Sequence, residues 1–347
     1  DLKSITSDTI LQRLAWAEQW FANSTNPESG LLEYMYFPSD DVYSSDNNHV
    51  RQLACMWAMA ELQAFNGNDK LNDVVTTSLD YYLQYMTEDG YLSIEGDAKL
   101  AYNAFMIMAL LGSPDYPDRD RILVDLGNAI LKLQKEDGSY NTYFDFDSDS
   151  GMDFYPGEAM LSLMKLYNYT EDERYLQSVH EAFSYYPDYW RKNKNTAFVP
   201  WHSQAYLLLY RAVEEPRIAE FVFEMNDWMV ENHQLMRTEY PDVHGGFTRS
   251  FPRNSTSAYM EGMNDAYTLA VLVGDEVHQA KYEQAIKYAV RFILQMQYTP
   301  DNVFYLENPE LAIGGFRHSL VFNDQRNDYT QHASFALMKT YENGIFE

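Results

Sequence analysis

Hydrophobic residues recur along the chain in two alternating helical patterns. In the first, apolar residues stand three and four positions apart between polar ones, as in an amphipathic helix with one buried face. In the second, the segment is apolar on all sides except its first turn, as in a helix that is buried all round. The amphipathic segments are 5–21, 71–86, 118–134, 172–191, 217–232 and 276–297. The apolar segments are 50–62, 97–111, 158–167, 201–210, 260–272 and 326–338.

The strict alternation predicts six helical hairpins. One polar residue near the start of each apolar segment serves as a marker, and successive markers are 51, 55, 46, 60 and 67 residues apart; the markers are Gln52, Asn103, Glu158, Gln204, Asn264 and Gln331. The repeats of an α-solenoid are shorter, at ~34 to 47 residues. Strand signals are sparse, and no linker rich in Pro, Gly and Ser divides the chain. We therefore predict an all-α protein of twelve helices, a closed (α/α)6 barrel that forms one domain over residues 1–347.

This architecture predicts where a functional site lies. Every inner helix of such a barrel runs in the same direction, because the chain returns through an outer helix each time. The six polar first turns therefore meet at one end, together with their free backbone N–H groups and the positive ends of their dipoles. We expect the site in a cleft at that end.

The loop before residue 158 raises the question of a metal. Asp147, Asp149 and Asp153 follow the spacing of a calcium-binding loop. However, Met152 stands at the sixth position, where that loop requires glycine, and Gly151 occupies a ligand position. We expect neither a metal nor a cofactor, and keep calcium at the three aspartates as a weaker alternative.

Charge and composition exclude several classes of partner. The chain has 52 acidic and 25 basic residues, a net charge of −27, and no cluster of Lys and Arg. Such a field repels nucleic acid and disfavours polyanions, although a few arginines can still form a local anion site.

No apolar run approaches the ~18 residues of a membrane span, so we expect a soluble protein. The start at Asp1 without a methionine is compatible with export after removal of an N-terminal segment. The oligomeric state and the compartment stay open.

The whole pattern resembles the six-hairpin (α/α)6 superfamily of sugar-active proteins, which includes glycoside hydrolases, polysaccharide lyases and the N-acylglucosamine 2-epimerase family. Three stretches strengthen the resemblance: His49-Val-Arg-Gln52, Gly157-Glu-Ala-Met160 with the helical return that follows it, and Tyr329-Thr-Gln-His-Ala333. The resemblance implies an enzyme with a carbohydrate substrate. It does not select one family, and the fold does not determine the reaction.

Paired carboxylates make glycoside hydrolysis the leading hypothesis, because the reaction needs two carboxyl groups across the sugar. The expected cleft offers Glu158, Glu261, Asp265 and Asp328. Glu158 is the preferred acid, since the apolar face of the neighbouring Tyr155 can raise its pKa. Asp265 or Asp328 would then be the base or nucleophile. The alternative for each carboxylate is to stabilise the N-terminus of its own helix.

Three other functions stay open. Two histidines, His202 and His332, suit proton transfer, and with Arg51 holding an anionic or carbonyl oxygen they favour a metal-independent sugar epimerase or a lyase. The 2-epimerase family uses a histidine pair of this general kind. A toroid that binds glycans without catalysis is also compatible with the pattern. Finally, residues 134–140 are similar to a repeat of terpene cyclases, although the acidic motif of those enzymes is not matched by residues 145–149.

The remaining polar and aromatic residues of the predicted helix starts are expected to bind the sugar. Flat rings with a polar tip suit the faces of sugars. The expected substrate-binding residues are Arg51, Gln52, Asn103, Tyr155, Trp201, Gln204, Glu261, Asn264, Arg326, Tyr329 and Gln331.

Overall fold

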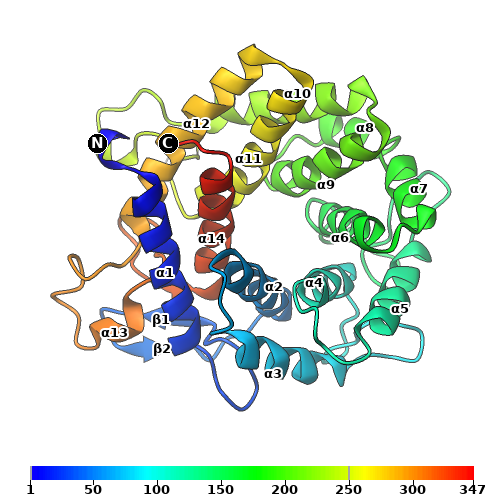
Figure 1. Ribbon diagram of the computed structural model, residues 1–347, viewed down its shortest axis with the longest axis horizontal. Coiled ribbons are helices and arrows are strands. Elements are labelled where there is room, and N and C mark those ends of the chain that lie inside the picture. Colours follow the sequence, from blue (N-terminus) through cyan, green and yellow to red (C-terminus); the bar gives the residue numbers. More distant parts are fainter. Residues whose placement is uncertain (1, 249–250) are drawn as a thin grey trace.

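The computed structural model describes residues 2–248 and 251–347, and within them the helices form two concentric rings (Figure 1). The inner ring consists of α2 (His49–Phe65), α4 (Leu100–Leu111), α6 (Tyr155–Thr170), α9 (Phe198–Val213), α11 (Ser255–Val273) and α14 (Asn327–Glu342). The outer ring consists of α1 (Ser7–Asn23), α3 (Asn72–Leu83), α5 (Arg119–Leu131), α7 (Glu173–Ala182), α10 (Pro216–His233) and α12 (Glu276–Met296). The predicted (α/α)6 barrel is confirmed.

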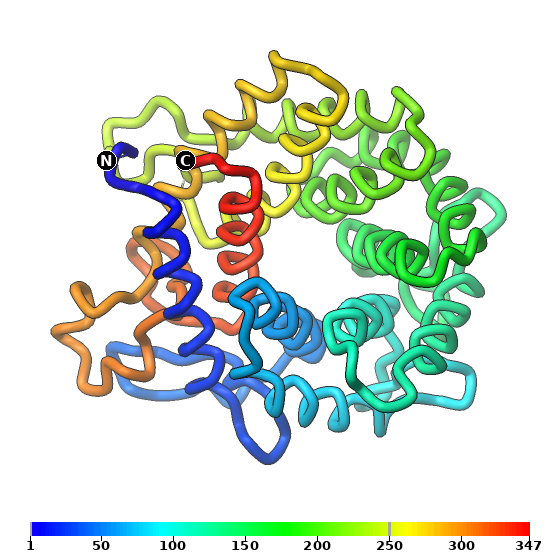
Figure 2. The backbone as a smooth tube through the Cα atoms, viewed as in Figure 1, coloured from blue at the N-terminus to red at the C-terminus, as the bar shows by residue number. Residues whose placement is uncertain are grey.

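The inner ring is closed. Each inner helix packs against the next in the order α2, α4, α6, α9, α11 and α14, and α14 packs back against α2. The backbone tube follows this single circuit from the blue N-terminal end to the red C-terminal end (Figure 2). In this order α6 and α14 lie on opposite sides of the ring, because two helices separate them in either direction.

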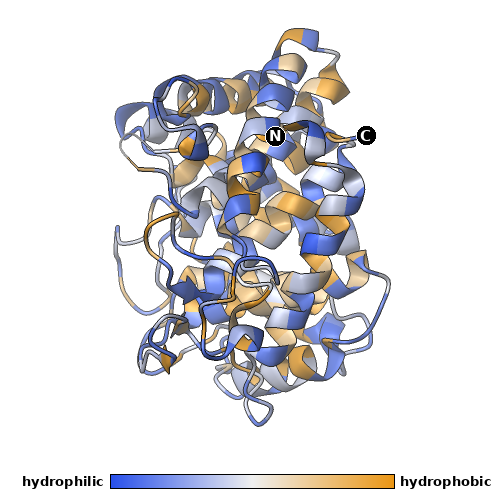
Figure 3. Ribbon diagram, turned by 90° about the vertical axis from the view of Figure 1, so that its left-hand side faces the viewer, coloured by the Kyte–Doolittle hydropathy of each residue, from blue (hydrophilic) through white to orange (hydrophobic). Residues whose placement is uncertain are grey.

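The two hydrophobic patterns explain which helix lies inside. In α4 every residue from Leu100 to Leu110 is buried, as a helix surrounded by protein requires. In α7 only Tyr175, Ser178, Val179 and Ala182 are buried, which is one face of the helix. The outward-facing helices accordingly carry a mixture of hydrophilic and hydrophobic residues (Figure 3).

The structure corrects several predicted boundaries. The predicted helix 172–191 is two helices, α7 and α8 (Tyr186–Lys192), since Pro187 has no N–H to continue the hydrogen-bond ladder. Three inner helices begin at least three residues earlier than predicted, α6 at 155, α9 at 198 and α11 at 255. Further elements of the described chain are α13 (Pro309–Ala312) and the 3-10 turns η1 (Leu2–Ser4) and η2 (Pro241–Val243).

A small sheet, which the sequence did not predict, lies beside the start of α14. Its strands are β1 (Met35–Phe37), β2 (Val42–Tyr43) and β3 (Gln325–Arg326), in the order β2-β1-β3 and antiparallel throughout. Met35 pairs with Arg326 in this register. The sheet therefore fixes the loop before α2 against the segment that leads into α14.

A repeated loop joins the outer helices to one another. After five of the outer helices the chain forms an isolated β-bridge around a glycine with positive φ. A Cβ on any of these glycines would approach the backbone of another outer helix to within 2.0 to 2.6 Å; the glycines are Gly30, Gly90, Gly138, Gly245 and Gly314. Such close approach is possible only without a side chain. The loop at Gly314 meets α1 at Trp16, which connects the last outer helix to the first.

This packing predicts that Gly245→Ala destabilises the protein more than Gly67→Ala. Both glycines have positive φ, +92° at Gly245 and +64° at Gly67. An added Cβ at Gly245 would lie 2.2 Å from the carbonyl oxygen of Tyr288, whereas an added Cβ at Gly67 would have no heavy atom within 4 Å. We expect Gly67→Ala to lower the free energy of unfolding by about 1 kcal/mol and Gly245→Ala by about 3 kcal/mol or more. Urea denaturation of both variants measures this, and equal losses would contradict the account.

Candidate functional site

A cavity of about 600 Å³ lies at the end of the barrel where the inner helices begin. We call it the mouth cavity. All six inner helices or the residues just before them contribute to its wall, as the parallel arrangement predicts. Nine of the predicted site residues line it: Glu158, Asp328, His332, Arg51, Tyr155, Trp201, Arg326, Tyr329 and Gln331.

Glu158 is a buried carboxyl group in the first turn of α6. Its side chain lines the mouth cavity, the residue is only 3% exposed, and Oε2 has no hydrogen-bond partner in the described structure. Burial raises the pKa of Glu158 to about 8. The group is therefore a neutral carboxylic acid at pH 7 and can donate a proton or a hydrogen bond into the cavity.

Asp328 lies across the ring in the first turn of α14 and is ionised. It accepts hydrogen bonds from Arg326 Nε (2.6 Å) and Nη2 (2.8 Å), and from Arg51 Nε (2.9 Å). Burial alone would raise the pKa of Asp328, but the hydrogen bonds and charge of Arg326, together with the charge of Arg51, lower it below the usual value. The mouth thus holds two carboxyl groups whose environments move their pKa values apart, which is the arrangement that separates an acid from a carboxylate.

His332 and Glu261 form a second polar pair. His332 Nδ1 lies 2.5 Å from Glu261 Oε1, and Glu261 is 1% exposed on α11 behind the histidine. With Nδ1 as the donor in this hydrogen bond, the other ring nitrogen, Nε2, is left for a ligand. This is how a buried carboxylate fixes the tautomer of a histidine that faces a cavity.

An aromatic layer closes the bottom of the mouth cavity. Phe105 and Trp201, with ring centroids 5.6 Å apart, both line the mouth cavity. The centroid of the Trp57 ring lies 6.1 Å from that of Phe105 and 4.1 Å from that of Phe335. Trp57 and Phe335 line a separate cavity of about 570 Å³ at the opposite end of the barrel. The two ends of the barrel are therefore separate sites.

The expectation that Asp265 and Gln204 lie at the mouth is wrong. Both line the cavity at the opposite end, where Lys339 Nζ lies 2.6 Å from Asp265 Oδ2 and 2.8 Å from Gln204 Oε1. The physical reason is the early start of their helices. Asp265 is the eleventh residue of α11, about 15 Å along the helix from its first residue at 1.5 Å per residue.

His202 also lies outside the mouth cavity, contrary to the prediction of a histidine pair. It is fully buried between helices, stacks on Phe198, and its Nδ1 lies 2.9 Å from the Phe198 carbonyl oxygen. Burial lowers the pKa of His202 to about 3, so the ring stays neutral. Gly157 allows this packing, because a Cβ there would lie 2.8 Å from the His202 ring.

Three amides expected to bind the sugar hold loops and helices together instead. Gln52 bonds to both backbone groups of Leu32. Asn103 donates to the carbonyl oxygens of Gly90 and Leu126. Asn264 donates to the Met260 carbonyl oxygen and to Thr340 Oγ1. These side chains point between helices, which periodicity does not reveal, because an inner helix is buried on every side.

The site residues expected from the sequence do not include two basic residues that line the mouth, Arg253 and His318. The two residues are brought together by an isolated bridge between Arg253 and Ser319 and by the hydrogen bond from Asn254 N to the His318 carbonyl oxygen. Each stands in the loop that follows a Gly-Gly-Phe sequence and precedes an inner helix. That shared position was the signal that could have found them.

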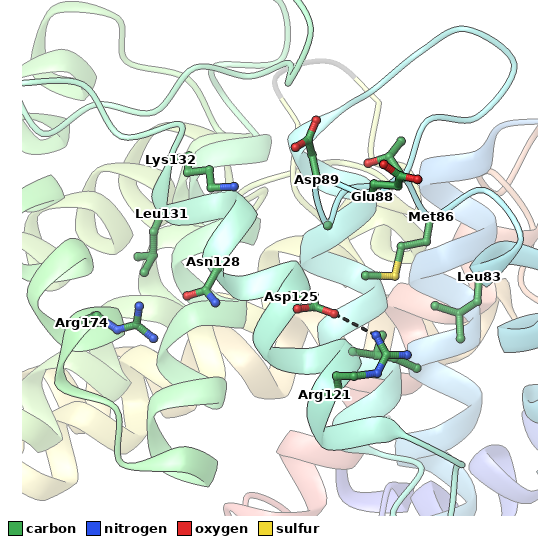
Figure 4. Close-up of a pocket in the computed structure, with 13 residues that line it drawn as sticks. Leu83, Met86, Glu88, Asp89, Arg121, Asp125, Asn128, Leu131, Lys132 and Arg174 are labelled. Carbon is green, nitrogen blue, oxygen red and sulfur yellow. Dashed lines mark hydrogen bonds and ion pairs between the residues drawn. The ribbon is translucent and has the colours of Figure 1, made fainter.

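A larger hollow of about 910 Å³ lies on the outer wall, along α5 and its neighbours. Its charged side chains stand on the outward face of these helices, with Arg121 paired to Asp125 at 3.0 Å (Figure 4). None of its lining residues belongs to an inner helix. It therefore lacks the converging first turns that distinguish the mouth cavity.

The aspartate-rich loop does not gather as a calcium site would. In the described residues no three His, Cys, Asp or Glu side chains come together in a way that could hold a metal ion. Asp153 instead accepts hydrogen bonds from Tyr189 (3.1 Å) and Asn195 (2.9 Å).

No helix of the described chain combines the length and apolar character that crossing a membrane requires.

Comparison with solved structures identifies the fold. The chain superimposes on a D-mannose isomerase with a TM-score of 0.69 at 12% identity, over 95% of this chain and 98% of that one. It matches the unsaturated glucuronyl hydrolase of Streptococcus agalactiae with a TM-score of 0.66 at 12% identity, over 97% and 93%. An inactive variant of an α-1,6-mannanase of Salegentibacter, in complex with α-1,6-mannotetrose, gives 0.68 at 11% identity, over 99% of both chains. The chain has the (α/α)6 barrel fold of these sugar-active enzymes.

Sequence comparison adds no family to this result. No model of a protein family matches the sequence, and no curated protein matches it. At identities of 11 to 12%, the structural likeness shows the fold alone.

The raised pKa of Glu158 predicts a specific dependence of stability on pH. Because the folded pKa is about 8 and the ordinary value is 4.5, the folded state holds a proton that the unfolded state releases between these values. This contribution to stability is complete below pH 4.5 and is lost as the pH rises through 8, and it amounts to about 4 to 5 kcal/mol. We expect Glu158→Gln to gain stability relative to the wild type between pH 5 and pH 9.

The matched control is Glu276→Gln, which changes an exposed glutamate in the first turn of α12. It should leave the pH dependence of the wild type unchanged. Urea denaturation at both pH values measures the difference. Parallel pH profiles for wild type and Glu158→Gln would show that Glu158 is not held neutral.

Proposed function

We propose that the protein is a carbohydrate-active enzyme that hydrolyses a glycosidic bond in the mouth cavity. The observation that carries the proposal is Glu158, a buried carboxylic acid with a pKa of about 8 and a free oxygen in an aromatic-walled cavity. An acid that keeps its proton near neutral pH is what the departure of a glycosidic oxygen requires. The names of the three similar structures, all enzymes of sugars, support a carbohydrate as the substrate.

In the proposed reaction Glu158 donates its proton to the oxygen of the scissile bond as the bond to the anomeric carbon breaks. Water adds to that carbon and gives its proton to the second carboxylate. The rings of Tyr155 and Trp201 on one side, and of Tyr259 and Tyr329 on the other, would hold the sugar by its faces.

Asp328 is the proposed second carboxylate. Three arginine N–H groups occupy three of its roughly four lone-pair positions, which leaves about one on Oδ1 for the attacking water. Because Asp328 and Glu158 stand on opposite sides of the ring, we propose an inverting reaction, which places a water molecule between two carboxyl groups ~6.5 to 9.5 Å apart.

The test is turnover of an oligosaccharide panel by the wild type and Glu158→Gln, with products read by chromatography and by the NMR signal of the new anomer. We expect the substitution to lower kcat about 10²- to 10⁴-fold. Wild-type activity should fall as the pH rises through about 8, where Glu158 loses its proton. Turnover by Glu158→Gln within a factor of ten of wild type, or activity that rises through pH 8, would refute this role.

The pair of His332 and Glu261 favours a second candidate, a sugar isomerase or epimerase. A histidine held by a buried carboxylate can remove a proton from a carbon next to a carbonyl group. The same reactions run in D₂O separate the candidates. Solvent deuterium on a sugar carbon, lost in His332→Gln, would favour the isomerase, whereas hydrolysis leaves carbon-bound protons in place.

A further inference from the structure

The mouth cavity has two chemically different halves. The half formed by α4, α6, α9 and the residues just before them presents aromatic and small side chains, and its one carboxyl group, Glu158, is neutral at pH 7. The half formed by α2, α11, α14 and their preceding loops presents three arginines, Arg51, Arg253 and Arg326, against one ionised carboxylate, Asp328. Among the described lining residues the arginines outnumber the ionised carboxylates, in a chain whose net charge is −27.

The cationic half keeps hydrogen-bond donors free for a ligand. Arg51 uses Nε on Asp328 and Nη1 on Tyr34, and Arg326 uses Nε and Nη2 on Asp328. A guanidinium has five N–H donors, so each arginine retains donors beyond these contacts. Arg253 is exposed and has no ion-pair partner in the part of the chain that the structure describes.

The aromatic contacts of this half hold the basic groups in place. The guanidinium of Arg326 lies 4.6 Å from the centroid of the Tyr329 ring, and the His318 ring lies 5.4 Å from the same tyrosine. The same half contains Gln331 on α14, 1% exposed, whose amide nitrogen and oxygen both lack a partner among the described residues. A buried amide without partners is costly, and a polar ligand in the cavity would satisfy it.

We propose that the ligand of the mouth cavity is an acidic sugar, whose carboxylate, sulfate or phosphate group lies against Arg253, Arg326 and Arg51 while its ring faces Trp201 and Tyr155. The proposal rests on the proposed function for the kind of ligand and adds its charge. The six converging helix N-termini favour the same sign of ligand charge. Because the rest of the protein repels anions, the selection must arise from these few residues.

The experiment measures binding of matched monosaccharides, which contain no glycosidic bond and so report on the site independently of hydrolysis. The pairs are glucuronate with glucose and galacturonate with galactose, and glucose 6-phosphate and glucose 6-sulfate distinguish the source of the anion. Titration calorimetry at low ionic strength is applied to the wild type, Arg253→Gln and Arg121→Gln. The last removes another exposed positive charge, from the outer wall (Figure 4), and is the control for net charge.

We expect at least one acidic sugar to bind about tenfold more tightly than its neutral partner. Arg253→Gln should remove most of that preference and leave the neutral sugar unaffected, while Arg121→Gln should change neither. Equal binding of acidic and neutral sugars, or an equal loss for both in Arg253→Gln, would overturn the proposal. So would inorganic phosphate that competes as well as the acidic sugar, since it would show a site for anions without selectivity for a sugar.

This result is separable from the proposed hydrolysis. If the acidic sugar binds with the expected dependence on Arg253 but the oligosaccharide panel is not cleaved, the charge of the ligand is supported and the hydrolysis is not. If neutral oligosaccharides are cleaved, with the expected loss in Glu158→Gln, and acidic sugars bind no more tightly than neutral ones, the hydrolysis is supported and the charge of the ligand is not.

Discussion

The contact between α14 and α2, the last and first inner helices, closes the barrel. It turns a row of hairpins into a ring, and the ion pair of Arg51 with Asp328 spans it at 2.9 Å. On the outside, Gln297 makes the corresponding connection by donating to the carbonyl oxygens of Gly314 and Arg13. Only a closed ring brings six helix N-termini to one place and seals the space between them.

Closure also determines the electrostatics of the mouth cavity. Inner helices surrounded by protein leave little water around Glu158, and desolvation alone holds that carboxyl group neutral. On the facing helix Asp328 is equally enclosed but stays ionised, because two arginines compensate for its burial. One ring therefore stabilises a proton donor and a carboxylate on opposite walls. This division is what the proposed chemistry uses, and the free donors of the arginines supply the proposed preference for an acidic ligand.

The fold could be predicted from the sequence because periodicity reports burial directly. Six segments that are apolar all round, alternating with six amphipathic ones, leave few architectures other than a closed double ring. The depth and direction of individual side chains were harder to predict. Glu158 follows Pro156 and Gly157, which mark the start of its helix, and its position was predicted correctly. The helix that contains Asp265 has no Pro-Gly pair at its start, so the start of that helix was placed about one turn or more too late.

A crystal structure of Glu158→Gln grown with a mixture of neutral and acidic oligosaccharides would show directly whether the mouth cavity is the sugar site. We expect a sugar in the mouth cavity, against the rings of Phe105 and Trp201, with its scissile oxygen beside residue 158 and its charged group toward Arg253. A sugar bound instead in the cavity at the opposite end, beside Lys339 and Asp265, with the mouth empty, would contradict it.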